Sequence, residues 1–278
     1  NPYIQAFHQW WENGLADNLE EIRITGGEPI MHTGTWRLFE WFEQNPDRGR
    51  NMRFAINSNL SPETPKVLDK LIEKSWYVPN FEIYTSMEAT KDQAEYIRDG
   101  LDYDLWKSNI HRVLKESNVA KLHMMMTINS LCLTTITEFM DEMLELRKEY
   151  GRRAPTMTLN ILRFPSFQSA AILPPHIKTF YKDKLEAWSF LHMQELTDGE
   201  RASVQRLIDY LDIVKTPHKN TADQAKLYND FKAFFSQFDV RREKNFVETF
   251  KGPIADWYET LEAEVPTAEQ IKSKTFVL

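Results

Sequence analysis

The residues Ile22-Arg23-Ile24-Thr25-Gly26-Gly27-Glu28-Pro29 decide the fold. The β-type run from Glu20 to Thr25 predicts a strand that ends in two glycines, a carboxylate and a proline. The glycines permit a sharp turn, and Pro29 ends the strand because it has no N–H to donate. The carboxyl ends of parallel strands hold the ligand site in α/β folds, so Glu28 is expected to project into such a site. The Glu28 carboxylate and the strand-end carbonyl oxygens together suit an ammonium group. The alternative is an ordinary strand-to-helix turn, of which two glycines alone are also typical.

Strands and amphipathic helices alternate through the first two thirds of the sequence. Helices are predicted near residues 3–17, 36–42, 62–74, 91–98, 103–116 and 134–150, with Ser61 as a candidate cap for the third. The repeat of roughly 25–40 residues is typical of right-handed βαβ units in a parallel sheet. The run Met124-Met125-Met126 shows no alternation and predicts a strand buried on both faces. The predicted strands are 20–25, 52–57, 81–86, 121–128 and 157–162.

Beyond Leu173-Pro174-Pro175 the hydrophobic period is helical throughout. Helices are predicted near 177–196, 200–214, 222–238 and 254–261, with a helical connector over 241–250. The sequence therefore predicts two domains, an α/β domain at residues 1–173 and a helical C-terminal extension at residues 174–278.

Composition narrows the class of protein. Thirty-four basic residues against 41 acidic ones give a net charge of −7, which argues against a broad nucleic-acid-binding face. The sequence has no apolar run of the ~20 residues that a membrane span needs, so no membrane association is predicted. The single cysteine, Cys132, excludes an intrachain disulfide and predicts a cytoplasmic location.

Polar residues stand at the ends of successive predicted strands, where a parallel fold gathers its ligand groups. Each of them alone is also typical of a turn or a helix cap. The residues are Glu28, Asn57, Ser58, Asn59, Ser86, Glu88, Asn129 and Arg163.

The strand that ends in Gly26-Gly27-Glu28-Pro29 resembles the radical S-adenosylmethionine (radical SAM) superfamily. Further segments resemble this superfamily in order and spacing, most closely its twitch type, over roughly residues 1–190: 54–59, 81–88, 96–100, 123–129 and 158–165. The resemblance implies a partial (β/α)6 TIM-like barrel that lacks its first strand, followed by an α-helical C-terminal region.

The resemblance also implies a cofactor site for S-adenosylmethionine. Gly26, Gly27 and Glu28 would hold the ammonium group, Ser86 and Glu88 would contact the ribose and carboxylate, and Arg98 would pair with the carboxylate. Asn129 and the Ile161-Leu162 backbone would flank adenine, while Asn59 and Arg163 would face the substrate. No catalytic side chain and no metal ligand is assigned in this chain. The complete set of implied cofactor residues is Gly26, Gly27, Glu28, Pro29, Asn57, Ser86, Glu88, Arg98, Asn129, Ile161 and Leu162.

The superfamily's CxxxCxxC loop is missing from this sequence, whose only cysteine is Cys132. By the resemblance, the sequence starts just after that loop and is expected to be inactive alone. The full-length form would use a [4Fe–4S] cluster and a flavodoxin or ferredoxin to cleave S-adenosylmethionine to a 5′-deoxyadenosyl radical. Its substrate is unidentified, a peptide being one candidate. The alternative is a degenerate barrel without a cluster that binds a nucleoside or a protein.

Overall fold

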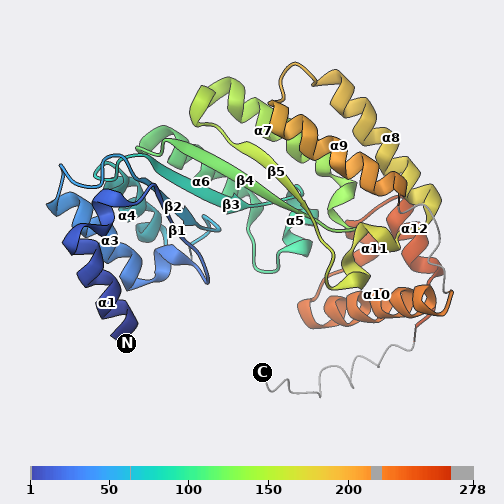
Figure 1. Cartoon of the computed structure of the whole chain (residues 1–278). Helices are drawn as coiled ribbons and strands as arrows, with labels where there is room; N and C mark the ends of the chain where they lie inside the picture. The colour runs from blue at the N-terminus through green and yellow to red at the C-terminus, as the bar shows by residue number, and fades with distance from the viewer. Residues whose placement is uncertain (1, 63, 214–220, 264–278) are drawn as a thin grey trace. The chain divides into compact units, whose positions relative to one another are not determined.

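The structure is a computed structural model that describes residues 2–62, 64–213 and 221–263 (Figure 1). It is a mixed α/β fold with a five-stranded parallel sheet in the order β1-β2-β3-β4-β5. The five predicted strands are confirmed within one residue at each end, and β1 and β5 stand at opposite ends of the strand order. The strands are β1 (Glu21–Ile24), β2 (Arg53–Asn57), β3 (Phe81–Ser86), β4 (Lys121–Ile128) and β5 (Thr156–Ile161).

A helix forms in each predicted region of the described residues, but the helix predicted over 177–196 ends at Leu191, and residues 192–196 are not helical. The helix predicted over 3–17 forms in three pieces because Gly14 adopts a φ of 115°. The first half of the chain contributes α1 (Pro2–Trp10), η1 (Trp11–Leu15), α2 (Ala16–Asn18), η2 (Pro29–Met31), α3 (Thr33–Gln44), α4 (Pro65–Ser75), α5 (Lys91–Ile97), α6 (Tyr103–Glu116), η3 (Cys132–Thr134) and α7 (Ile136–Tyr150). The second half contributes η4 (Gly151–Arg153), η5 (Ser166–Gln168), η6 (Ala170–Ile172), α8 (Pro175–Leu191), α9 (Asp198–Ile213), α10 (Thr221–Arg242), α11 (Phe246–Thr249) and α12 (Pro253–Thr260). Residue 214, the predicted end of the second C-terminal helix, lies outside the described residues.

The chain divides into two compact units. Unit 1 comprises Asn1–Ser86, Asp104–Met125 and Met143–Met157. Unit 2 comprises Met87–Tyr103, Met126–Glu142 and Thr158–Leu278. These units are defined by contacts and not by fold type, so the predicted boundary at residue 173 stays a prediction.

An aromatic core lies between α3 and one face of the sheet in unit 1. Phe39 of α3 contacts Phe54 and Phe81 edge to face, with ring centroids 5.3 and 5.4 Å apart, and Phe42 contacts Phe54 at 5.3 Å. Burial alternates along β4 as well, and Met125 is half-buried between the buried Met124 and Met126. The prediction that this strand is buried on both faces is therefore wrong. The sheet in unit 1 has one apolar face and one polar face.

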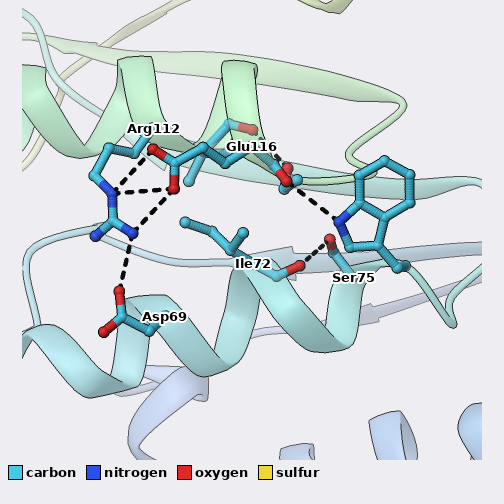
Figure 2. A network of polar contacts seen from close by, with 8 residues as sticks. Asp69, Ile72, Ser75, Arg112 and Glu116 are labelled. Carbon is cyan, nitrogen blue, oxygen red and sulfur yellow. Dashed lines mark hydrogen bonds and ion pairs between the residues drawn. The ribbon is translucent and has the colours of Figure 1, made fainter.

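Helices α4 and α6 of unit 1 are joined by polar contacts (Figure 2). Arg112 of α6 donates to Asp69 of α4 at 2.9 Å and also pairs with Glu116. Ser75 Oγ donates to the Ile72 carbonyl at 2.6 Å and so satisfies a carbonyl in the last turn of α4. At the other end of α4, Thr64 occupies the cap position and Pro65 is the first helical residue. The prediction that Ser61 caps this helix is therefore wrong.

The C-terminal helices build the aromatic core of unit 2. Tyr96 of α5 contacts the rings of Phe246 and Phe250, and its hydroxyl donates to Asp239 of α10 at 2.6 Å. Burial and this carboxylate both raise the pKa of the Tyr96 hydroxyl. Helix α5 is thus held by α10 and α11, and this fixes Arg98 at its C-terminal end.

None of the described helices combines the length and apolarity needed to cross a membrane.

Candidate functional site

The loop after β1 turns sharply, as its sequence predicts. Gly26 and Gly27 have φ of 91° and 55°, in the region that L-residues with a side chain adopt at a cost of roughly 1–2 kcal/mol. A Cβ at either position would meet no atom within 4 Å. The glycines are therefore needed for their backbone conformation and not for lack of space. Glu28 follows in an extended conformation, and Pro29 begins the short helix η2.

Glu28 is held by the neighbouring strand-end loop of unit 1. Its Oε2 accepts a hydrogen bond from the Asn59 N–H at 2.8 Å. Its Oε1 is buried and has no partner among the described residues, and the same holds for Asn57 Oδ1 at the end of β2. An unpaired buried acceptor costs roughly 1–3 kcal/mol, so this corner of the fold is suited to a ligand that brings hydrogen-bond donors.

The other predicted residues of unit 1 have different roles. Asn59 Oδ1 accepts from the Ser61 N–H at 2.9 Å, which makes Asn59 a turn-forming residue as well as a neighbour of Glu28. Ser86 ends β3 and is half-buried, opposite Met125 in the register of β3 and β4. The structure therefore brings Glu28 and Asn59 together, and Asn57 ends β2 two residues before Asn59.

Glu88 and Arg98 of unit 2 form an ion pair with each other. Arg98 donates through its NH2 nitrogen to Glu88 Oε2 at 2.6 Å, and only 3% of the Glu88 side chain is exposed. The Thr127 N–H lies 3.5 Å from the same carboxylate oxygen. The Nε of Arg98 is buried and has no partner in the described part of the chain. The sequence singled out both residues and missed their contact, and their role toward a cofactor stays a prediction.

The predicted adenine-flanking residues also lie in unit 2. Asn129 Oδ1 accepts from the N–H groups of Leu131 and Cys132 at 2.8 and 3.0 Å and so stabilises the turn that begins η3. The Leu162 N–H donates to the Ile128 carbonyl at 2.8 Å, beside the half-buried Ile161, and Arg163 is exposed. A pocket of about 100 Å³ borders Asn129. This volume is below the roughly 300 Å³ at which small-molecule pockets begin, so the pocket alone does not fit a nucleoside.

Cys132 does not fit a cluster ligand. It is fully buried, burial raises the pKa of its thiol, and its Sγ donates to the Asn129 carbonyl at 3.2 Å. In the residues that the structure describes, no three His, Cys, Asp or Glu side chains are grouped so that they could hold a metal ion.

Sequence reasoning missed a polar network on the sheet of unit 1. The Arg23 guanidinium lies 3.7 Å from the centre of the Tyr84 ring, and His123 stacks on that ring at 4.2 Å. His123 Nε2 lies 2.8 Å from Glu82 Oε2, and its Nδ1 lies 2.9 Å from Thr156 Oγ1. Burial lowers the pKa of His123, although the Glu82 carboxylate opposes this shift. The signal in the sequence was a polar residue at every second position of several strands.

No protein-family model matches this chain, and no curated protein matches it.

Proposed function

We propose that this chain is a radical SAM partial barrel, lacking the first strand of a (β/α)6 barrel, and that it binds S-adenosylmethionine at the carboxyl ends of its parallel strands. The observation that carries the proposal is the pair of buried, unpaired acceptors, Glu28 Oε1 and Asn57 Oδ1, beside the two glycines of positive φ. An alkylammonium group is a triple donor with a positive charge, and such a group suits a carboxylate or amide oxygen that lacks a donor.

Each unit contributes its own residues to this proposal. In unit 1, Glu28 binds the ammonium while the Asn59 N–H fixes its carboxylate at 2.8 Å. In unit 2, Arg98 retains a buried Nε–H donor beyond its bond to Glu88, which suits a carboxylate. Ser86, Glu88, Asn129, Ile161 and Leu162 complete the proposed cofactor set, and Asn59 and Arg163 are proposed to face the substrate. When bound, S-adenosylmethionine supplies the 5′-deoxyadenosyl group that members of this superfamily release as a radical.

The iron–sulfur cluster of that superfamily does not fit the residues of this chain. A four-iron cluster takes three or four thiolates, and the only cysteine is the buried Cys132. We therefore propose no cluster ligand, and no contact with a flavodoxin or ferredoxin, among the residues of this chain.

Calorimetric titration with S-adenosylmethionine tests the proposal. Glu28→Gln should weaken binding roughly tenfold to a hundredfold because a charge-assisted hydrogen bond is lost. The amide oxygen can still accept from Asn59, so the loop should keep its conformation. Glu73→Gln is the matched control, because the Glu73 side chain is 67% exposed and its ion pair with Lys74 is long, at 3.6 Å. Equal affinities for the protein and Glu28→Gln would remove Glu28 from the site.

A second candidate function is a cluster-free barrel that binds a nucleoside or a protein. The buried position of Cys132 favours it, because the chain then needs no thiolate ligand. Calorimetric titration with adenosine beside S-adenosylmethionine separates the two, because only the first candidate needs the methionyl ammonium group for binding. Equal affinities for adenosine and S-adenosylmethionine would favour the second candidate.

A further inference from the structure

One face of the sheet in unit 1 is polar and partly exposed. Along β3, Phe81, Ile83 and Thr85 are buried, whereas Glu82, Tyr84 and Ser86 between them are half-buried. Parallel sheets are usually covered by apolar packing on both faces. Charged side chains in the middle of a parallel sheet therefore indicate a face that meets water or a polar ligand.

Arg23 lies across this face because its neighbour is small. Arg23 of β1 is opposite Ala55 of β2, and Ala55 is opposite Glu82 of β3. The methyl group of Ala55 leaves room for the long Arg23 side chain to cross β2. The guanidinium reaches the ring of Tyr84 on β3, at 3.7 Å from its centre.

The guanidinium is held in one orientation. Its flat face rests on Tyr84, and its NH2 nitrogen donates to Glu21 at 3.1 Å. Tyr84 is fixed in turn by the stacked His123, whose two ring nitrogens contact Glu82 and Thr156. A guanidinium has five N–H donors, and this arrangement leaves several of them on a side chain that is 35% exposed. Most of the rotational entropy that an arginine loses on binding an anion is therefore already lost.

The charge on this face is opposite in sign to that of the whole chain. Arg23, Arg53 and Lys121 face two carboxylates, Glu21 and Glu82, and the lowered pKa of His123 favours its neutral form. Arg53 also binds Glu21, so one carboxylate is shared by two arginines. The face has a net positive charge in a protein of net charge −7, which favours an anionic ligand.

We propose that Arg23, oriented by Tyr84, binds an oxyanion of a small substrate molecule, either a carboxylate or a phosphate. A planar fork of N–H donors pairs with two oxygens of such a group. Tyr84 is opposite Asn57 in the register of β2 and β3, so this subsite adjoins the residue whose Oδ1 is buried and unpaired. The identification of the ligand as substrate rests on the proposed function, whereas anion binding by Arg23 does not.

The test uses the whole chain labelled with ¹⁵N-arginine, without S-adenosylmethionine, and follows the Nε–H signal of Arg23 by NMR. Inorganic phosphate and glutarate are the two anionic probes, and glutaramide is the neutral control. We expect a saturable shift with at least one anion and none with glutaramide. Saturation by phosphate identifies a phosphate ester as the substrate class, and saturation by glutarate identifies a carboxylic acid.

Variants make the test specific. Where Arg23 itself is replaced, binding is followed through the NMR signals of the anionic probe. Arg23→Gln should abolish saturable binding, whereas Arg50→Gln removes an equal charge from a side chain of the same unit that is 63% exposed and should not change it. Tyr84→Phe keeps the ring under the guanidinium and should preserve affinity, while Tyr84→Ala should weaken it about tenfold. No saturable shift, an equal shift with glutaramide, or binding that survives Arg23→Gln would overturn the inference. If the unchanged protein binds the anion but not S-adenosylmethionine, only the proposed function is contradicted.

Discussion

Replacing Arg98 by alanine should destabilise the protein more than any change of an exposed arginine. Among the described residues, Arg98 is the only cation that pairs with Glu88, at 2.6 Å, and the replacement removes it. Glu88 would then hold a carboxylate that is 3% exposed, with the Thr127 N–H at 3.5 Å as its remaining contact. A carboxylate that loses its partner at this burial is poorly compensated, because little of it is exposed to water.

The magnitude follows from the burial of the two partners. Removal of one partner from a buried ion pair costs roughly 3–5 kcal/mol. The Arg98 side chain is 30% exposed, so water already screens part of the pair and we expect the lower end of this range, about 3 kcal/mol. A loss of this size lowers the midpoint of thermal unfolding by about 6–12 °C in a chain of this size.

Thermal unfolding followed by circular dichroism measures the effect against two further variants. Arg50→Ala is the control, because Arg50 and its partner Asp47 are 63% and 90% exposed, and it should change stability by less than about 0.5 kcal/mol. Adding Glu88→Gln to Arg98→Ala should restore at least about 1 kcal/mol, because the amide has no charge to bury. A loss below about 1 kcal/mol in the single variant, or no recovery in the double variant, would refute the reasoning.

Two further predictions concern backbone conformation and pH. Gly27→Ala should cost about 1–2 kcal/mol in thermal unfolding, because the φ of 55° disfavours any side chain, whereas Gly199→Ala, in a helix and without positive φ, should be neutral or stabilising. Burial lowers the pKa of Lys178 to about 8 from the ordinary 10.5, so the folded protein releases this proton at a lower pH than the unfolded chain. The cost of burying its charge is therefore present below about pH 8, and the free energy of unfolding should rise as the pH increases toward about 10.5. Urea unfolding at about pH 7 and about pH 10 measures this gain, and Lys178→Met should lack it.

The strands were predictable because their ends are marked locally. Gly26, Gly27 and Pro29 end β1 through backbone geometry alone, and that geometry does not depend on tertiary contacts. The start of α4 shows where local reasoning needs one more rule. Pro62 and Pro65 both suit a first helical position, but Thr64 precedes Pro65 and is extended, with φ −113° and ψ 116°. The clash of a proline ring with the residue before it excludes Thr64 from a helix, so α4 can begin only at Pro65.

The candidate site was predictable only in part because its contacts are tertiary. The sequence identifies Glu28, Glu88 and Arg98 as polar residues after strands or near them, but it cannot show that Glu88 and Arg98 bind each other. Three consecutive methionines hid the alternation of β4. The neighbours Lys121, His123 and Thr127 keep a period of two, with Leu122 and Ile128 on the opposite face.

The polar face of the sheet and the strand-end acceptors indicate ligand groups of opposite charge. In unit 1, Glu28 Oε1 and Asn57 Oδ1 are acceptors without donors among the described residues. The Arg23 guanidinium has N–H donors that its contacts with Tyr84 and Glu21 do not use. Unit 2 holds a donor of its own, the buried Nε of Arg98. Unpaired acceptors favour a cation, and unpaired guanidinium donors favour an oxyanion. Variants at Glu28 therefore test the binding of an ammonium group, and variants at Arg23 or Arg98 test the binding of an acidic group. A ligand without an ammonium group would leave Glu28 Oε1 and Asn57 Oδ1 unpaired, at a cost of about 1–3 kcal/mol for each buried atom.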